Sequence, residues 1–352
     1  MTEAANHEAL RRIAAVTPVL TGIARAGDVL RLSEGELGHA GPPFASTADV
    51  PPVVLNALAG AVLHEGWAGT LVEAERLIRD GHIRLRPNHD LGTVSPMAGV
   101  VRPGQIVMCV ADANGTGVTY ATLAEAGRRA LRFGVYGPDV AAGLRWLDAE
   151  LGPAIARALP RDGLPVLPLI ADGIRLGDDV HQRNVGGMLS FARALPELES
   201  PMRSWLLGNP QAFLNTAMAA AKLALDAAAG VASSRVVTAI SRNGATCGIR
   251  MAGTGRRWFT VPASIPKVGS SRRTHRMTCN RISVTAPSWR PSGSAARSRT
   301  RRPNSPAQWD APGKRRVRPG CACGRCSATA TRRSRPCSWA RRASGSGSTP
   351  RV

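Results

Sequence analysis

The sequence has 352 residues, with 46 Lys and Arg against 24 Asp and Glu and a formal net charge of +22. No apolar run reaches about 18 residues, so no membrane-spanning helix is expected, and the polar beginning of the chain has no secretory signal core. The charge is uneven, because residues 1–267 hold 26 basic and 23 acidic residues, while residues 268–352 hold 20 basic residues and a single acid, Asp310. Two compositions therefore meet near residue 267.

The first 267 residues, which we call the body, contain only two of the seven cysteines, Cys109 and Cys247. Such sparse cysteine usage offers no disulfide framework and is typical of a reducing compartment. We therefore expect a cytoplasmic protein.

Two helices are predicted in the first third of the chain. Asp49 and the two prolines after it start a helix that runs to about His64, since proline suits the first helical position. Thr70 and Glu73 form a capping box, and apolar residues at helical spacing continue to Gly81, where glycine stops the helix.

Apolar runs predict the next three elements. The segment 105–111 (QIVMCVA) reads as a short buried strand. Pro138 starts a helix through Leu147, and the longest helix is predicted over 211–229, where small residues favour close packing.

A hairpin is predicted at the end of the body. The β-branched segment 235–240 is strand-like, Asn243-Gly244 is a hairpin turn signal, and 246–251 pairs back. A third strand follows at 258–261.

These elements predict an α/β (mixed α+β) fold over residues 1–267, helix-rich with short strands and a C-terminal hairpin. Two subdomains are expected to divide near residues 150–165. No phosphate-binding loop and no G-x-G-x-x-G after a strand is present, which argues against a nucleotide cofactor.

Polar residues gather first at Asn88-His89-Asp90 and at Arg102, in a loop between likely strands. His89 can act as a general acid or base beside Asp90, or it can bind an anion together with Arg102. The alternative is a turn with a structural histidine and solvated charges.

A second polar cluster is Gly177–Asn184. If this segment is helical, Asp178 and His181 share a face, and Asp179 pairs with Arg183 at a helix end. In the functional interpretation, Asp178, His181 and Arg183 enter a cleft and orient a carboxylate or phosphate. A divalent metal is a further alternative, but it would need ligands from elsewhere in the chain.

Two more clusters carry arginine or histidine. Arg242 and Asn243 lie at the hairpin turn with Arg250 across from them, and arginine forks suit planar carboxylate and phosphate groups. His39 lies in a Gly/Pro loop. The alternatives are an exposed hairpin tip and an ordinary turn.

Residues 268–352 contain no Leu, Phe or Tyr and are rich in Arg, Ser and Pro. This tail cannot bury enough apolar surface to fold, so we expect disorder. We favour an out-of-frame translation, because shifting the frame of plausible codons for 275–287 restores a normal soluble-protein string. The alternatives are a basic arm for nucleic acid and a zinc module, whose C-x-C-x2-C-x10-C spacing is poor.

Eight ordered stretches of the body resemble the YlbE/AllG-like family. They are HAGPP (39–43), HEGW (64–67), NHDLGTVSPMAGVVRP (88–103), LRFGVYGPDV (131–140), LGDDVHQRN (176–184), FLNTAMAAAKLALDAAAGV (213–231), VVTAISRNGATCGIRMAG (236–253) and RWFTVPA (257–263). Family members usually carry a further α/β segment before the position where this chain begins and a glycine-rich region after the last motif. We therefore expect a truncated and frameshifted member, in which these losses can abolish activity.

The resemblance implies a subunit of oxamate carbamoyltransferase, which converts oxalurate and phosphate to oxamate and carbamoyl phosphate in allantoin breakdown. It implies an FdrA-type partner, similar to succinyl-CoA ligases, and a further carbamoyltransferase subunit. A noncatalytic assembly subunit that binds the FdrA-type partner is the alternative. Nucleic-acid binding through the tail is the third candidate, and few aromatic residues interleave with basic ones in the body to support it.

Carbamoyl transfer requires anion binding, oxyanion stabilisation and proton movement. We expect the protein to need no cofactor and no membrane. The residues expected to move protons or orient the proton-moving groups are His89, His181 and Asp178. The residues expected to bind the substrate are Arg102, Arg183, Asn184, Arg242, Asn243, Arg250 and His39.

Overall fold

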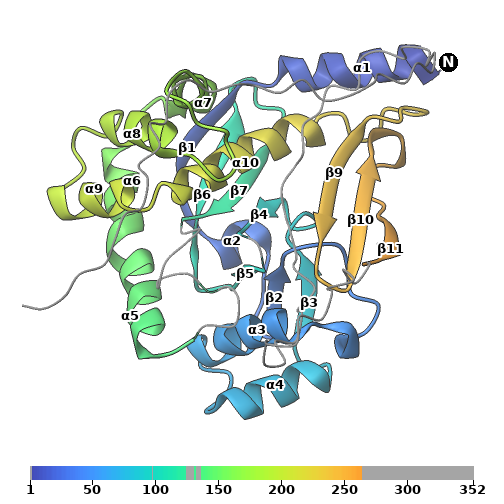
Figure 1. Ribbon diagram of the computed structural model, residues 1–352, viewed down its shortest axis with the longest axis vertical. Helices are drawn as coiled ribbons and strands as arrows, with labels where there is room; N and C mark the ends of the chain where they lie inside the picture. Colours follow the sequence, from blue (N-terminus) through green and yellow to red (C-terminus); the bar gives the residue numbers. More distant parts are fainter. Residues whose placement is uncertain (1, 97, 124–130, 132–135, 264–352) are drawn as a thin grey trace, which may run out of the picture. The chain divides into compact units, whose positions relative to one another are not determined.

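The computed structural model describes residues 2–96, 98–123, 131 and 136–263 (Figure 1). The tail 268–352, with its out-of-frame, basic-arm and zinc interpretations, lies outside the described residues. Within the described part, helices and short strands alternate, which confirms the predicted mixed α/β class. No helix of this part is long and apolar enough to cross a membrane.

A five-stranded sheet with the order β4-β7-β6-β1-β8 lies at the centre of the body. Its neighbours pair antiparallel except β4 and β7, which are parallel. The strands are β1 (Pro18–Arg25), β4 (Thr93–Val94), β6 (Ile106–Asp112), β7 (Val118–Thr122) and β8 (Leu164–Pro165). The prediction of a buried strand at 105–111 is confirmed by β6.

Helix α10 (Gln211–Asp226) packs against β1, β4, β6 and β7 of this sheet (Figure 1). Its many alanines let the helix approach closely, and most of its side chains are buried. This helix confirms the longest predicted element, 211–229. It ends three residues earlier than predicted, at Asp226, and turns follow.

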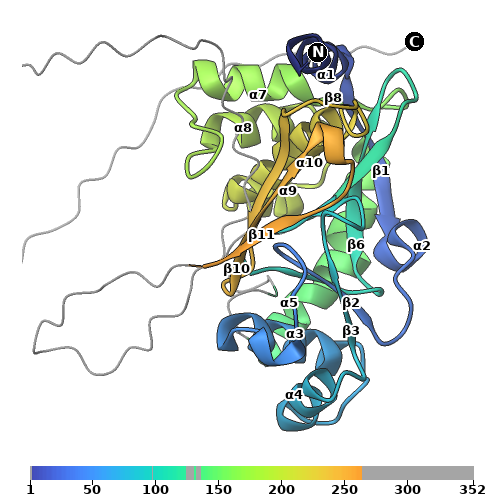
Figure 2. The same ribbon diagram turned by 90° about the vertical axis from the view of Figure 1, so that its right-hand side faces the viewer.

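A second sheet has the order β3-β2-β5. Strands β2 (Glu36–His39) and β3 (Arg84–Pro87) are parallel, and β5 (Val100–Val101) pairs antiparallel with β2. The crossover between β2 and β3 contains α3 (Pro52–His64) and α4 (Leu71–Arg79), which pack on each other (Figure 2). Both helices were predicted, and the Thr70 side chain accepts the Glu73 N–H as a capping box requires.

The predicted hairpin is confirmed as a third sheet with the order β11-β10-β9. It consists of β9 (Val237–Arg242), β10 (Thr246–Met251) and β11 (Phe259–Pro262), all antiparallel. Strand β9 contacts α10, so this sheet is held beside the C-terminal half of the long helix.

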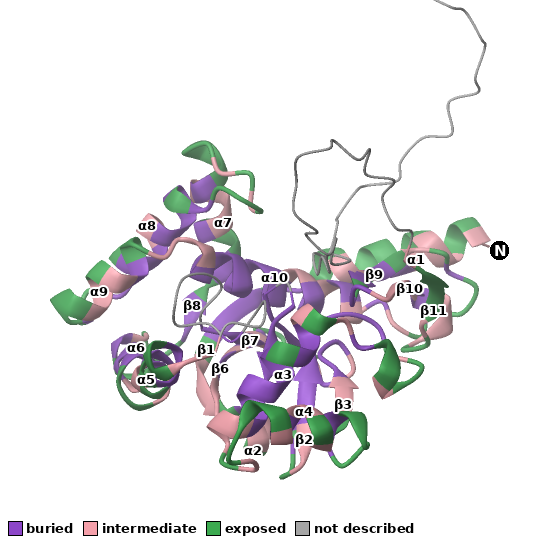
Figure 3. Ribbon diagram, turned by 60° about the horizontal axis from the view of Figure 1, so that its bottom comes forward, coloured by how far each residue is buried: buried purple, intermediate pink, exposed green. Residues whose placement is uncertain are grey.

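Further helices surround these sheets, and buried residues are concentrated on α10 and α3 (Figure 3). The helix opened by Pro138 is α5 (Pro138–Trp146), which continues as a π-helical turn (Leu147–Leu151) and then α6 (Gly152–Ala158). The α-helices that the sequence did not predict are α1 (Thr2–Ala15), α2 (Ala26–Leu30), α6, α7 (Val166–Arg175), α8 (Val185–Arg193) and α9 (Ser200–Leu207).

Candidate functional site

The ends of β2 and β3 meet the β9–β10 hairpin in a buried polar cluster. The Asn88 N–H donates to the His39 carbonyl at 2.8 Å, and the Asn243 side chain donates to the Pro42 carbonyl at 2.8 Å. Segments far apart in sequence are thereby joined. We call this cluster the polar junction; its members are His39, Asn88, His89, Asp90, Lys222, Ser241, Asn243, Arg250 and Trp258.

Arg250, Asp90 and Trp258 form a compact charged group within the polar junction. The Arg250 guanidinium lies 4.2 Å from the centroid of the Trp258 ring and makes an ion pair with Asp90. The indole Nε1–H of Trp258 donates to Asp90 Oδ1 at 3.1 Å. Burial, aided by the charge of Arg256, lowers the pKa of Arg250 to about 10, so the side chain stays cationic at neutral pH.

The backbone of β10 leaves room for this group through Gly248. A Cβ at position 248 would lie 2.8 Å from the Pro42 Cβ and 2.9 Å from the Trp258 Cε3. Trp258 and Pro42 therefore close over the strand only because glycine occupies this position.

His89 lies edge-on to Trp258, with ring centroids 5.7 Å apart, and is only 7% exposed. Burial holds its pKa well below the usual value, and the charges of Lys222 and Arg250 lower it further. The imidazole is thus neutral at physiological pH, near two cations that are each ion-paired, Arg250 with Asp90 and Lys222 with Asp226. Lys222 was not predicted as a site residue, although it is the single lysine or arginine in the sequence of α10.

Several buried atoms of the polar junction lack a hydrogen-bond partner among the described residues. They are His39 Nε2, Asn88 Oδ1, Ser241 Oγ and Arg250 Nε. An unpaired buried polar group costs about 1–3 kcal/mol, so a group of them calls for a ligand or ordered water.

His39 and Asn243 anchor this arrangement. His39 is fully buried, and its ring centroid lies 4.6 Å from that of Phe44. Burial lowers the pKa of His39 to about 4. The Asn243 Oδ1 accepts the N–H groups of Ala245 and Thr246, which shapes the hairpin turn. Arg242 lies beside them on β9 but is exposed.

The segment Gly177–Asn184 is a loop between α7 and α8, so the helical pairing of Asp179 with Arg183 does not form. Asp178 instead accepts the N–H groups of Gly186 and Gly187 at the start of α8. Asp179 accepts the backbone N–H groups of the loop, and the side chains of His181 and Arg183 are exposed.

Helix α10 separates this loop from the polar junction. Asn184 donates to Gln211, the first residue of α10, whereas Lys222 of the polar junction lies eleven residues later. At 1.5 Å per residue these positions are about 16 Å apart along the helix. The predicted residues named so far therefore lie in two separate places, the polar junction and this loop.

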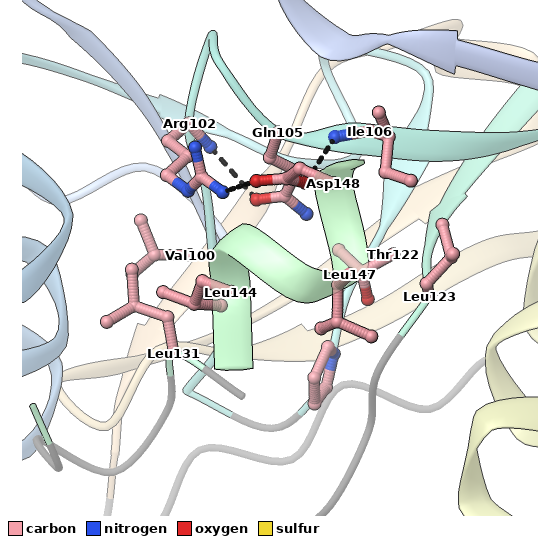
Figure 4. A pocket seen from close by; sticks show the side chains of 11 residues that line it. Val100, Arg102, Gln105, Ile106, Thr122, Leu123, Leu131, Leu144, Leu147 and Asp148 are labelled. Carbon is pink, nitrogen blue, oxygen red and sulfur yellow. Dashed lines mark hydrogen bonds and ion pairs between the residues drawn. The ribbon is translucent and has the colours of Figure 1, made fainter. Parts of the chain in front are cut away.

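Arg102 occupies a third place, beneath the π-helical turn. Its Nη1 donates to Glu65 Oε1 at 2.8 Å and its Nη2 pairs with Asp148. The Asp148 Oδ1 also accepts the Ile106 N–H at 3.0 Å. Figure 4 shows Arg102 and Asp148 at the polar end of a small pocket whose remaining wall is largely apolar.

Within the part of the chain that the structure describes, no three His, Cys, Asp or Glu side chains come close enough to hold a metal ion. The two described cysteines, Cys109 and Cys247, are free thiols.

Comparison with known proteins gives consistent relatives. The family model described as "Oxamate carbamoyltransferase subunit AllG" matches residues 83–278. The chain is 34% identical over 277 residues to oxamate carbamoyltransferase subunit AllG of Escherichia coli K12, covering 75% of this chain and 66% of that protein. It is 31% identical over 272 residues to the uncharacterized protein YahG of the same strain, and this match covers 74% of this chain and 57% of YahG. The chain thus spans less than two thirds of these relatives.

A solved structure has the same fold. It is the crystal structure of a conserved protein of unknown function from Enterococcus faecalis V583, with a TM-score of 0.70 and 33% identity. The match covers 74% of this chain and 66% of that one.

Proposed function

The chain belongs to the family of oxamate carbamoyltransferase subunits AllG, and from this membership we propose that its polar junction holds the anionic substrates of a carbamoyl transfer. The observation that carries the proposal is the group of buried polar atoms without a partner among the described residues, near two buried cations, Arg250 and Lys222, which pair with Asp90 and Asp226. Oxalurate and phosphate are both anions, so a positive field and free donors suit them.

Six members of the polar junction have a chemical part in this proposal. Arg250 and Lys222 hold the carboxylate or phosphate charge. Asn88 and Asn243 orient the ureido group, because side-chain amides both donate and accept hydrogen bonds. His39 supplies a further ring nitrogen that lacks a partner among the described residues.

His89 moves the proton. A phosphate oxygen attacks the ureido carbonyl, the C–N bond to the oxamate nitrogen breaks, and carbamoyl phosphate and oxamate result. The neutral imidazole of His89 accepts the proton of the attacking phosphate and returns it to the leaving nitrogen. The depressed pKa of His89 keeps its imidazole in the neutral form at neutral pH, the form that has a free ring nitrogen.

The chain is proposed to act with other subunits, since the name of its E. coli relative describes a subunit. The family resemblance implies an FdrA-type partner and a further carbamoyltransferase subunit, and the assay includes both. Alanine substitutions at His89, His181 and Arg183 in the assembled enzyme test the site. We expect His89→Ala to lower turnover about 100-fold or more, whereas the exposed His181 and Arg183 lie outside the polar junction. Wild-type turnover in His89→Ala would end the site assignment.

A noncatalytic assembly role is the second candidate, and one observation favours it. The large apolar side chains Ile174, Leu176 and Val185 are exposed around the α7–α8 loop, and Leu167 is exposed at the start of α7. Exposed apolar patches often mark protein interfaces. Pull-down with an FdrA-type protein, together with the activity of the subunit alone, separates this role from catalysis.

A further inference from the structure

The pocket beneath the π-helical turn is separate from the polar junction and joins charged groups to an apolar wall. Its volume is about 30 Å³. This exceeds the roughly 10–15 Å³ that one water needs, so the pocket can accept a group of a few heavy atoms. Figure 4 shows Arg102, Gln105 and Asp148 at one end, with Val100, Leu144 and Leu147 toward the other.

The π-helical turn places Asp148 at the polar end. A π-helical turn within a helix is rare and occurs frequently at functional sites. Here it lets one carboxylate accept the Ile106 N–H and pair with Arg102 at the same time. A carboxylate has about four acceptor positions, so Asp148 can accept a further donor.

Arg102 supplies the complementary donor. Its two terminal nitrogens are engaged by Glu65 and Asp148, but its buried Nε has no hydrogen-bond partner among the described residues. A buried N–H without an acceptor is costly, which points to an oxygen that this pocket receives from a ligand or from water.

The charges limit what this ligand can be. Glu65 and Asp148 together outweigh Arg102 by one negative charge, so an anion is disfavoured. A cation is disfavoured because it offers no acceptor to the unpaired Nε–H of Arg102 and adds a second positive charge beside it. A neutral planar amide offers one oxygen to Arg102 Nε and one N–H to Asp148.

From this geometry we propose that the Arg102–Asp148 pocket binds the neutral amide or ureido end of a small molecule. The site is independent of the proposed function, since none of its residues belongs to the polar junction. Burial raises the pKa of Asp148, which agrees with a site that avoids extra negative charge.

Three ligands of nearly equal shape test the proposal on the full chain. Acetamide is neutral, acetate is an anion and acetamidinium is a cation, so they differ mainly in charge. In saturation-transfer NMR at millimolar concentration we expect acetamide to bind about tenfold more tightly than either ion. Nuclear Overhauser effects should connect the acetamide methyl with the methyls of Leu144 and Leu147.

A pocket-filling variant with a matched control locates the site independently. Leu144→Phe should weaken acetamide binding about tenfold or more, whereas Leu167→Phe, at an exposed position of α7, should leave it unchanged. Circular dichroism checks that both variants fold. The proposal is overturned if acetamide does not bind, if acetate or acetamidinium binds more tightly, or if the acetamide methyl contacts methyl groups elsewhere. These outcomes are read from the wild-type chain, so they decide the proposal even if Leu144→Phe does not fold.

Discussion

Arg250 lies over the face of Trp258, its guanidinium carbon 4.2 Å from the ring centroid, although a turn of chain separates β10 from that tryptophan. Asp90, from the loop after β3, contacts both side chains. The pairing fixes the third sheet on the β2–β3 loops and sets a cation beside His89.

Removal of this cation should destabilise the fold. Arg250→Met leaves Asp90 without its ion pair, and because Asp90 is partly exposed we expect a loss of about 2 kcal/mol rather than the larger cost of a fully buried pair. Urea unfolding measures this loss in the free energy of unfolding. Arg242→Met, at an exposed neighbouring position, should stay within about 0.5 kcal/mol of the wild type; equal effects of the two variants would contradict the account.

Gly248→Ala should destabilise the junction between β10 and Trp258. The added methyl meets the Pro42 Cβ and the Trp258 ring, and overpacking of this kind costs about 1–3 kcal/mol. Gly22→Ala is the matched control, because nothing lies within 4 Å of a Cβ there. Comparable stability of both variants in thermal unfolding would show that the contact is not tight.

Stability should fall as the pH decreases below about 6.5, because buried His39 remains neutral in the folded chain while the unfolded chain takes up a proton. The folded pKa of about 4 and an unfolded value near 6.5 place this loss between those two pH values. Each such histidine adds up to about 1.4 kcal/mol per pH unit to the slope of the free energy of unfolding against pH. Urea unfolding from pH 7 to pH 5 should show a smaller slope for His39→Gln, whereas exposed His82→Gln should leave it unchanged.

Lys222→Met should raise the pKa of His89 toward its ordinary value, because it removes one of the two charges that lower it. Lys222→Arg keeps the charge and should keep the depressed pKa. Histidine NMR titration measures both variants, and an unchanged pKa in Lys222→Met would remove this lysine from the polar junction.

Asp178→Ala should cost about 1 kcal/mol of stability, because the carboxylate accepts two N–H groups at the start of α8. Asp178→Asn retains an acceptor and should recover most of the loss in a denaturant titration. A fully stable Asp178→Ala variant would be inconsistent with this capping contact.

Local signals predicted much of the fold. The capping box at Thr70, the proline start of α3 and the Asn243-Gly244 turn are each written in a few neighbouring residues, and each formed as expected. The Asp179–Arg183 spacing failed as a helix signal because Gly177, at a φ of 92°, ends α7 before it.

The site was only partly predictable. His39, His89, Asn243 and Arg250 were identified as polar breaks in apolar patterns, and they do meet in the polar junction. Lys222 pairs with Asp226 one turn later on α10, and its proximity to His89 depends on how α10 crosses the sheet, which no local pattern encodes. Arg102 was also identified, but its two carboxylate partners come from distant segments.

Histidine NMR of the full chain during an oxamate titration tests the central claim most directly. If the polar junction holds an anion, the ring resonances of His89 should shift with oxamate and saturate, while those of exposed His82 stay in place. An unmoved His89 at saturating oxamate, or a shift confined to exposed histidines, would contradict the account.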